Sequence, residues 1–341
     1  MEKSNVGIRS IGVYLPPGVR DSRWLAEASG IPEEVIREKF GILQVYKAEP
    51  GESVKDMAVK AARKALDGLD PAELDLVVYC GSEYKDFYLY NCAAGVAYDL
   101  GAVNANAFEI HSLCSAGAYS LKILKAMMLA DPELKHVLVV SSSRESDLLD
   151  YRNERSRFMF NFGDGAAAVL LERDLGRNLI LETRMITEGQ FAEDVAVPAI
   201  GCRNYSEEGL RTETGRYILD VPDVAGMKKR LDPITLDNFI RVIREAAEKS
   251  GYDRYQVNYL APIFMKRSIL DRILEHFRLT EENSFVLEEY GHCQSADAFI
   301  ALERGLALGR VKEGDLAVLF GAGTGYTWAA TAVKWGPAEI Q

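Results

Sequence analysis

The chain has 341 residues, of which 48% are hydrophobic, so it can bury a large core as one domain or as two of about 170 residues. Its net charge of −11, without a basic run, argues against non-specific binding to nucleic acid. We find no apolar run of the ~18 residues that span a membrane, no signal-peptide core and no C-x-x-C spacing among the five cysteines. These features predict a cytoplasmic enzyme with no metal, no nucleic-acid partner and no membrane partner.

The first half of the chain alternates helical and strand patterns. An apolar stripe at helical spacing precedes a break at Asp70-Pro71, and residues 74–80 then form a buried strand pattern. A glycine-rich turn at 163–165 leads into a second apolar strand pattern at 166–171. The residues of the helical stripe are Val54, Met57, Ala58, Ala61, Ala62 and Leu66.

The second half repeats this order of patterns. A helical stripe ends near Gly251, residues 257–262 form a strand pattern, and a glycine-rich turn at 321–325 precedes the strand pattern at 326–333. Two rounds of the same alternation predict a duplicated, layered α/β fold with halves at 1–175 and 176–341. The stripe consists of Leu236, Phe239, Ile240, Ile243 and Ala247.

One reactive side chain lies at the same kind of junction in each half. Cys114 stands between a short strand pattern and a helix start rich in small residues, and His292 stands in a segment of similar layout in the second half. We therefore expect the thiol and the imidazole to occupy matching places and to meet at one active site. A thiol paired with an imidazole is typical of thioester chemistry on a cysteine.

These motifs together resemble the thiolase superfamily, specifically β-ketoacyl-acyl-carrier-protein synthase III. The resemblance rests on the Cys114 segment, on residues 162–169, on Tyr290-Gly-His292 and on residues 321–328, and it covers nearly the whole chain. It implies a five-layer αβαβα sandwich of two similar halves that is usually a homodimer. It also implies acyl-CoA or acyl-carrier protein as substrate, with no cofactor.

Cys114 matches the acyl-accepting cysteine of that family. A lone cysteine is more often a buried small hydrophobe, but a helix start favours a thiolate, and its small neighbours leave room for a substrate. The resemblance implies an oxyanion hole made by the backbone N–H of Cys114 and one N–H from Gly323, Thr324 or Gly325.

Two departures from the family pattern concern the partners of the cysteine. Ile263 stands where synthase III enzymes usually have a histidine, and His292 stands in their asparagine slot. In the family, histidine and asparagine together stabilise the carbanion left by malonyl decarboxylation, so these changes count against decarboxylating condensation. Asp297 follows His292 by five residues and completes a possible Cys–His–Asp relay. The alternative is that His292 caps a helix and Asp297 is a solvated helix residue.

Glu83 is a further candidate for catalysis. It follows the strand pattern 74–80, near the place of the acid/base glutamate in the related hydroxymethylglutaryl-CoA synthases. An ion pair with Lys85 explains it equally well. His111 has no motif support, and we expect it to be structural.

The expected substrate and carrier contacts are Arg37, Lys39, Phe87 and Leu89. Arg37 and Lys39 are candidates for phosphate contacts, although Val35 stands at the family's tryptophan position and exposed cations are usually just solvated. Phe87 and Leu89 lie in a loop that the family inserts into the partner's acyl channel, with core packing as the competing interpretation.

Three functions are compatible with these features. The first is an acyltransferase, of fatty acid or polyketide biosynthesis, in which Cys114 accepts an acyl group from a thioester and His292 activates the acceptor. The second is carbon–carbon condensation, as in synthase III or hydroxymethylglutaryl-CoA synthase, with His292 and Glu83. The third is a non-catalytic subunit of a ketosynthase-like heterodimer, against which the intact Cys114 counts.

Overall fold

A computed structural model of the chain describes residues 4–202 and 217–338. A mixed nine-stranded sheet runs through its centre. Its strands are β1 (Val6–Tyr14), β4 (Leu76–Tyr79), β5 (Asn106–Glu109), β6 (His136–Ser143), β7 (Gly165–Arg173), β8 (Arg177–Thr187), β9 (Val257–Pro262), β10 (Leu316–Gly323) and β11 (Thr327–Pro337). A separate two-stranded sheet pairs β2 (Gly18–Asp21) with β3 (Gln44–Lys47).

The sheet contains the same strand arrangement twice. The strand order is β5-β4-β6-β7-β1 in the first half-sheet and β8-β11-β10-β9 in the second, and the two meet where Gly7 of β1 pairs with Leu179 of β8. In each half-sheet the strand next to the inner one, β7 or β11, runs antiparallel to both of its neighbours. The remaining neighbours within each half-sheet are parallel, so β9-β10-β11-β8 repeats the arrangement β4-β6-β7-β1 in mirror order, and β5 has no counterpart among the described strands.

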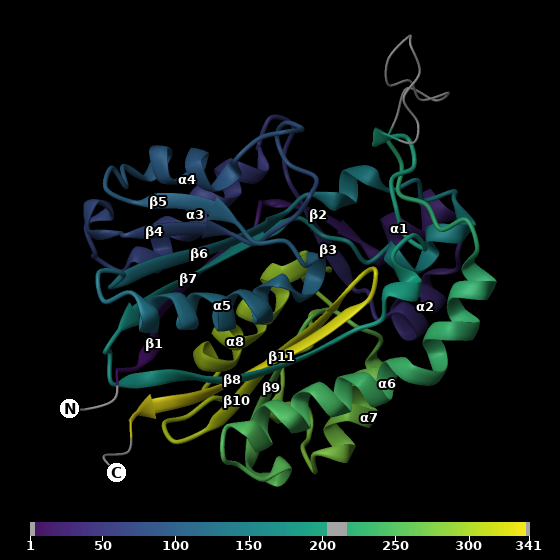
Figure 1. Cartoon of the computed structure of the whole chain (residues 1–341). Helices are drawn as coiled ribbons and strands as arrows, with labels where there is room; N and C mark the ends of the chain where they lie inside the picture. Colours follow the sequence, from purple (N-terminus) through teal and green to yellow (C-terminus); the bar gives the residue numbers. More distant parts are fainter. Residues whose placement is uncertain (1–3, 203–216, 339–341) are drawn as a thin grey trace.

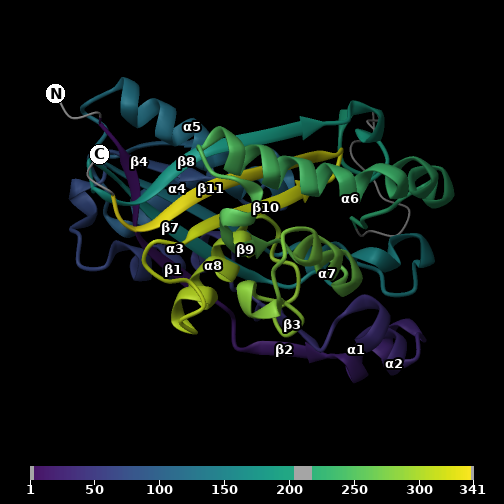
Figure 2. The same ribbon diagram turned by 90° about the horizontal axis from the view of Figure 1, so that it is seen from below.

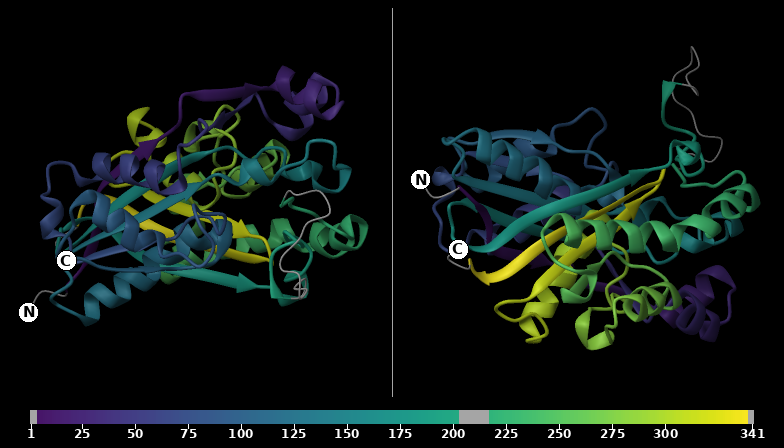
Figure 3. Two further views of the ribbon diagram at one scale, coloured as in Figure 1. Left: turned by 90° about the horizontal axis from the view of Figure 1, so that it is seen from above. Right: turned by 60° about the horizontal axis from the view of Figure 1, so that its bottom comes forward.

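The helices form three layers around the two half-sheets. They are α1 (Ser22–Ser29), α2 (Glu33–Val35), α3 (Val54–Leu66), α4 (Cys92–Leu100), α5 (Ala116–Ala130), α6 (Val224–Lys249), α7 (Arg267–His276) and α8 (Asp297–Ala307). Helices α3 and α4 cover one outer face, α6 and α7 cover the other, and α5 and α8 lie between (Figures 1 and 3). The predicted αβαβα fold is confirmed.

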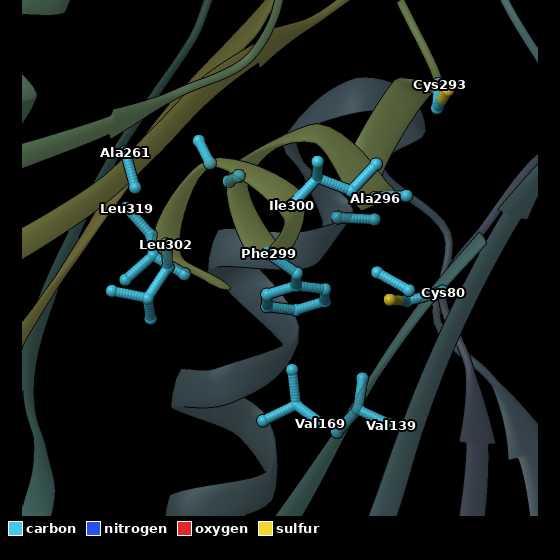
Figure 4. Packing of buried hydrophobic residues seen from close by; sticks show 14 of the residues in the cluster. Cys80, Val139, Val169, Ala261, Cys293, Ala296, Phe299, Ile300, Leu302 and Leu319 are labelled. Carbon is cyan, nitrogen blue, oxygen red and sulfur yellow. The ribbon is translucent and has the colours of Figure 1, made fainter. Parts of the chain in front are cut away.

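The middle layer carries the most apolar packing. Figure 4 shows the Phe299 ring of α8 pointing toward Val139 of β6 and Val169 of β7, with Cys80 close by, and all four side chains are fully buried. Figure 2 shows from below how α8 lies behind β9 and β10, with α6 and α7 in front of them. A helix covered by sheet on both sides must be apolar around most of its circumference.

This constraint explains the composition of the one helix, among the described residues, that is long and apolar enough to span a membrane. The window Leu113–Ala130 has 18 residues and a mean hydropathy of 1.2, so by length and composition alone it could cross a membrane. Half of the window is buried inside the protein, because α5 packs between strands of both half-sheets. Its apolar character is that of a core helix.

The local signals in the sequence explain where the elements begin and end. Helix α3 starts at a capping box made by Ser53 and Asp56, and it ends at Leu66 because Asp67 takes a left-handed conformation with φ +47°. The helix therefore stops before the predicted break at Asp70-Pro71. The strand predicted at 257–262 is β9, and the one predicted at 74–80 is shortened to Leu76–Tyr79.

Candidate active site

Cys114 lies in a single 3₁₀ turn, Leu113–Ser115, directly before α5. A second such turn, Gln294–Ala296, directly precedes α8. The two turns pack against each other, and the start of α5 packs as closely, since a Cβ added at Gly117 would come within 2.4 Å of the carbonyl oxygen of Ser295. Both halves of the chain therefore contribute to one site at the paired N-terminal ends of the central helices.

The backbone conformation fixes the register of the duplication. Leu113 and Gln294 each open their 3₁₀ turn, and both have positive φ, +47° and +56°. By this register Cys114 corresponds to Ser295, and His292 corresponds to His111. The expectation that Cys114 and His292 occupy matching places is therefore wrong by three residues, although the two side chains do meet.

Cys114, His292 and Asp297 form a continuous chain of polar contacts. His292 Nε2 lies 3.2 Å from Cys114 Sγ, and His292 Nδ1 lies 2.5 Å from Asp297 Oδ2. All three residues are buried, and Asp297 has no exposed surface. The alternative in which Asp297 is a solvated helix residue is wrong, because its carboxylate points into the protein toward the imidazole.

Backbone N–H groups supply the other partners of the Asp297 carboxylate. Phe264 N donates to Oδ2 at 2.7 Å, and Cys293 N donates to Oδ1 at 2.7 Å. Three donors on one carboxylate stabilise its charged form in the interior. A charged Asp297 then fixes the orientation of the imidazole ring, with Nε2 directed at the thiol.

The electrostatics of the site favour a protonated histidine. Burial alone would lower the pKa of His292, but the charges of Asp297 and of the Cys114 thiolate raise this pKa well above its ordinary value. A cysteine next to an imidazolium and at a helix N-terminus is the setting in which proteins hold a nucleophilic thiolate. The geometry therefore suits transfer of the thiol proton to His292.

The glycine-rich segment at the end of β10 lies against Cys114. A Cβ added at Gly323 would lie 3.2 Å from Cys114 N, and one at Gly321 would lie 3.1 Å from Cys114 O. Gly325 has φ +111°, a conformation that L side chains rarely adopt. The same Cβ at Gly321 would lie 2.7 Å from Ile263 Cγ2, so the apolar Ile263 occupies space beside the cysteine.

Glu83 is not part of this chain of contacts. Its side chain is 62% exposed, and its Oε1 lies 3.0 Å from His111 Nδ1, while Lys85 pairs with Glu109 instead. His111 Nε2 also lies 3.4 Å from Glu109 Oε2. The predicted ion pair between Glu83 and Lys85 is therefore wrong. The Glu83 carboxylate pairs instead with His111, which we had expected to be structural.

The four expected substrate contacts lie on the surface. Arg37 and Lys39 are exposed on the turn Ile36–Phe40, and Phe87 and Leu89 are exposed on the loop after β4, with Leu89 at 96%. Phe87 packs edge-on against Tyr90, with ring centroids 5.8 Å apart. The core-packing interpretation of Phe87 and Leu89 is therefore wrong.

Sequence reasoning missed a cavity of about 300 Å³ that none of the three contact-chain residues lines. Arg20, Trp24, Tyr151 and Leu149 are among its lining residues, and Arg20 lies over the Trp24 ring. Leu149 also packs in a small apolar cluster with Phe162, whose ring stacks on His292. The wall residues come from distant segments of the chain without a shared motif, so the sequence offers no signal for them.

Comparisons with known proteins identify the family of the chain. Residues 108–189 match the model of the 3-oxoacyl-[acyl-carrier-protein (ACP)] synthase III family, and residues 247–335 match the model of its C-terminal region. The chain is 30% identical over 329 residues to the β-ketoacyl-[acyl-carrier-protein] synthase III of Aquifex aeolicus, covering 95% of this chain and 97% of the relative. It is 29% identical over 335 residues to that of Clostridioides difficile, with 97% and 99% covered.

A solved structure extends the comparison to polyketide synthesis. The priming β-ketosynthase from the R1128 polyketide biosynthetic pathway superimposes with a TM-score of 0.84 and is 26% identical, with 98% of both chains covered. The two proteins thus share their fold along nearly their full length.

The ion pairs of His111 predict a dependence of stability on pH. Hydrogen bonds to Glu109 and Glu83 raise the pKa of His111 to about 9 from an ordinary value of 6.5. The contribution of His111 to the free energy of unfolding should be fully present below pH 6.5 and should disappear as the pH rises through about 9. Because His111 is 37% exposed, we expect only about 0.2–1 kcal/mol, or about 1–3 °C in Tm.

Thermal unfolding of His111→Gln and the unchanged protein from about pH 6 to about pH 10 measures this difference. The Tm gap should narrow as the pH rises. His136→Gln is the matched control, since the His136 ring lies 4.0 Å from its nearest carboxylate. A gap that stays constant for His111→Gln would mean that the ion pairs do not form.

Proposed function

Because the chain belongs to the 3-oxoacyl-[acyl-carrier-protein] synthase III family and is an acyl-transferring enzyme, we propose that Cys114 carries the acyl group, that His292 moves the protons and that Asp297 orients the His292 ring. The single observation that carries this proposal is the contact chain Sγ–imidazole–carboxylate, with 3.2 Å and 2.5 Å between the successive atoms. The arrangement has the logic of a catalytic triad with a cysteine nucleophile.

In the first step the Cys114 thiolate attacks the carbonyl carbon of a thioester. The carbonyl oxygen becomes an oxyanion, for which the backbone N–H of Cys114 and one N–H of the turn Gly323, Thr324 and Gly325 are the proposed donors. When the oxyanion collapses, the carbon–sulfur bond of the donor breaks. The imidazolium of His292 gives its proton to the departing thiol, and the acyl group remains on Cys114.

In the second step His292 is neutral and acts as a general base. Its Nε2 takes the proton from an acceptor hydroxyl, amine or thiol as that atom attacks the acyl-cysteine. Collapse of the second oxyanion releases the product and regenerates the thiolate beside an imidazolium. Asp297 holds the ring so that Nε2 faces the reacting atoms in both steps.

Ile263 supports transfer to a heteroatom over condensation. Decarboxylation of a malonyl group leaves an enolate oxygen that needs hydrogen-bond donors, and Ile263 has none to offer in the place where the family has a histidine. His292 Nδ1 is engaged with Asp297, which leaves Nε2 as the free donor of the ring. Glu83, the candidate base of the condensing alternative, is paired with His111.

The proposed donor is an acyl-CoA or an acyl-carrier protein, as the names of the synthase III relatives suggest for the carrier. Arg37 and Lys39 are exposed cations suited to phosphates of either carrier. We place the reaction in fatty acid or polyketide biosynthesis in the cytoplasm. The proposal involves no cofactor, metal, nucleic acid or membrane. It assigns the two structural halves to residues 1–175 and 176–341.

A homodimer belongs to the same proposal. In the sheet order β5 is a terminal strand, and among the described residues no strand pairs with its outer edge. Phe87, Tyr88 and Leu89 expose large apolar side chains on the nearby loop. An unpaired edge next to exposed apolar residues favours pairing with a second copy of the chain.

The covalent intermediate is the first prediction of this mechanism. Incubation with a panel of acyl-CoA thioesters and acylated carrier protein should add one acyl group per chain, and Cys114→Ala should lose the adduct. Intact-mass spectrometry measures the adduct, and Cys293→Ala is the control because Cys293 is a buried neighbour of the triad. An adduct that survives in Cys114→Ala would refute the assignment.

The apolar Ile263 leads to a prediction about malonyl substrates. We expect carbon dioxide release from malonyl-carrier protein to be slow or absent, because the enolate lacks its usual donor pair. The A. aeolicus relative, assayed in parallel, provides the reference rate. Release at the rate of that relative would favour the condensing alternative.

The roles of His292 and Asp297 can be separated by their variants. General-base catalysis contributes ~10²–10⁴-fold, so His292→Ala should slow acyl transfer by about that factor. Asp297→Asn should slow it less, because the ring remains and only its orientation and charge support are weakened. Steady-state rates together with circular dichroism measure both effects, and full activity in Asp297→Asn would reduce the triad to a Cys–His pair.

A further inference from the structure

A phenylalanine covers one face of the His292 ring. The rings of Phe162 and His292 stack with centroids 5.3 Å apart and an interplanar angle of 22°. Phe162 is 5% exposed, so it is as buried as the triad itself. Both ring nitrogens of His292 are engaged in the plane of the ring, which leaves its face for Phe162.

The stack follows from paired backbones. His292 N donates to Asn161 O at 2.6 Å, and Gly163 N donates to His292 O at 3.1 Å, which forms a parallel bridge between Phe162 and His292. Two residues opposed in a parallel bridge direct their side chains to the same side. The bridge is tight, since a Cβ at Gly291 would lie 3.0 Å from Gly163 Cα.

Asp164 anchors the segment that carries Phe162. Its buried carboxylate accepts hydrogen bonds from Ala48 N at 2.8 Å and from Ser146 Oγ at 2.6 Å, and it lies 3.0 Å from Lys47 Nζ. Its own N–H donates to Tyr46 O at 2.9 Å. The backbone that carries Phe162 is therefore fixed, two residues further on, to β3 and to the segment after β6.

We propose that Phe162 is a positioning residue that favours the imidazolium form of His292 and thereby the thiolate form of Cys114. The face of an aromatic ring carries negative partial charge and attracts a cation placed over it. A leucine of similar bulk would fill the space without this attraction. The inference deepens the proposed function and rests on its Cys114–His292 pair.

Other charged groups near the pair stay in place when only Phe162 is changed. Asp297 and Cys114 contact the imidazole directly, and they raise the pKa of His292 against the opposing effect of burial. Tyr326 is close enough to Cys114 to interact with its charge. Asp164 and Glu145 interact in the same way with Cys293. A shift caused by Phe162→Leu therefore reports the contribution of the ring.

Alkylation of Cys114 by iodoacetamide tests the proposal, because its rate follows the thiolate and needs no acyl donor or acceptor. The rate at Cys114 is read from the peptide by mass spectrometry across the pH range. In Phe162→Leu the midpoint of the rise should move to higher pH by about 0.5–1 unit, which slows alkylation about three- to tenfold below that midpoint. Phe162→Tyr, which keeps the ring, should restore the profile.

Phe160→Leu is the matched control. Phe160 is also buried, lies two residues away and packs against Tyr151 with centroids 5.0 Å apart instead of against His292. In thermal unfolding, Phe160→Leu should lose about as much stability as Phe162→Leu. Its alkylation rate at Cys114 should depend on pH as in the unchanged protein. Equal shifts in Phe160→Leu and Phe162→Leu, or no shift in Phe162→Leu, would overturn the proposal.

Two further outcomes keep the test decisive. If Phe162→Leu does not fold, Phe162→Met replaces it, since methionine fills similar volume with a flexible chain and carries the same expected shift. If the shift appears but no thioester acylates Cys114, the inference about Phe162 holds and the proposed function fails. If acylation occurs without the shift, the function holds and the inference fails.

Discussion

The interior of this protein contains a carboxylate with no access to solvent, and its partners determine the geometry around it. An isolated charge in such a place costs several kcal/mol, so it persists only with close donors. Asp297 receives them from Phe264 N, Cys293 N and His292 Nδ1. These three groups belong to the segment after β9, to the turn before α8 and to the imidazole, and the carboxylate holds them in one arrangement.

The duplication gives this carboxylate a second role. Asp297 is the first residue of α8, where a negative charge is favourable near the N-terminal end of the helix dipole. By the register of the two 3₁₀ turns, Ala116 is its counterpart at the start of α5. The N-terminus of α5 therefore has no carboxylate of its own at that position, and its dipole is available to a thiolate on Cys114. The two helix N-termini thus favour different anions: the carboxylate of Asp297 at α8 and a thiolate on Cys114 at α5.

Much of this was predictable from the sequence, and what was missed has identifiable physical causes. Apolar spacing located α3 and β9, and the Cys114 and His292 motifs located the site, because these signals are local. The register of the duplication was recognised from the positive φ of Leu113 and Gln294. Leucine and glutamine rarely adopt positive φ, so the sequence does not predict this conformation. The partner of Glu83 was missed because His111 is distant in sequence and reaches it only through the fold.

The contact between Phe162 and His292 was missed for the same reason, although both residues lay in motifs that had been recognised. A motif fixes the backbone of its own segment, whereas the stack arises from a bridge between segments of the two halves. The loop with Leu89 was identified only through the family resemblance, because local apolar spacing does not distinguish an exposed loop residue from a buried one.

The position of Ile263 explains how one scaffold can serve two reactions. In the condensing members of the family, a histidine and an asparagine both offer donors to an enolate oxygen. Here Ile263 fills the first place with an apolar side chain against Gly321, and His292 fills the second with Nδ1 committed to Asp297. A ring whose one nitrogen is held by a carboxylate is suited to accepting and returning a proton at the other nitrogen. In the mechanism that we propose, these substitutions exchange a site that stabilises a carbanion for one that carries a proton between Cys114 and an acceptor.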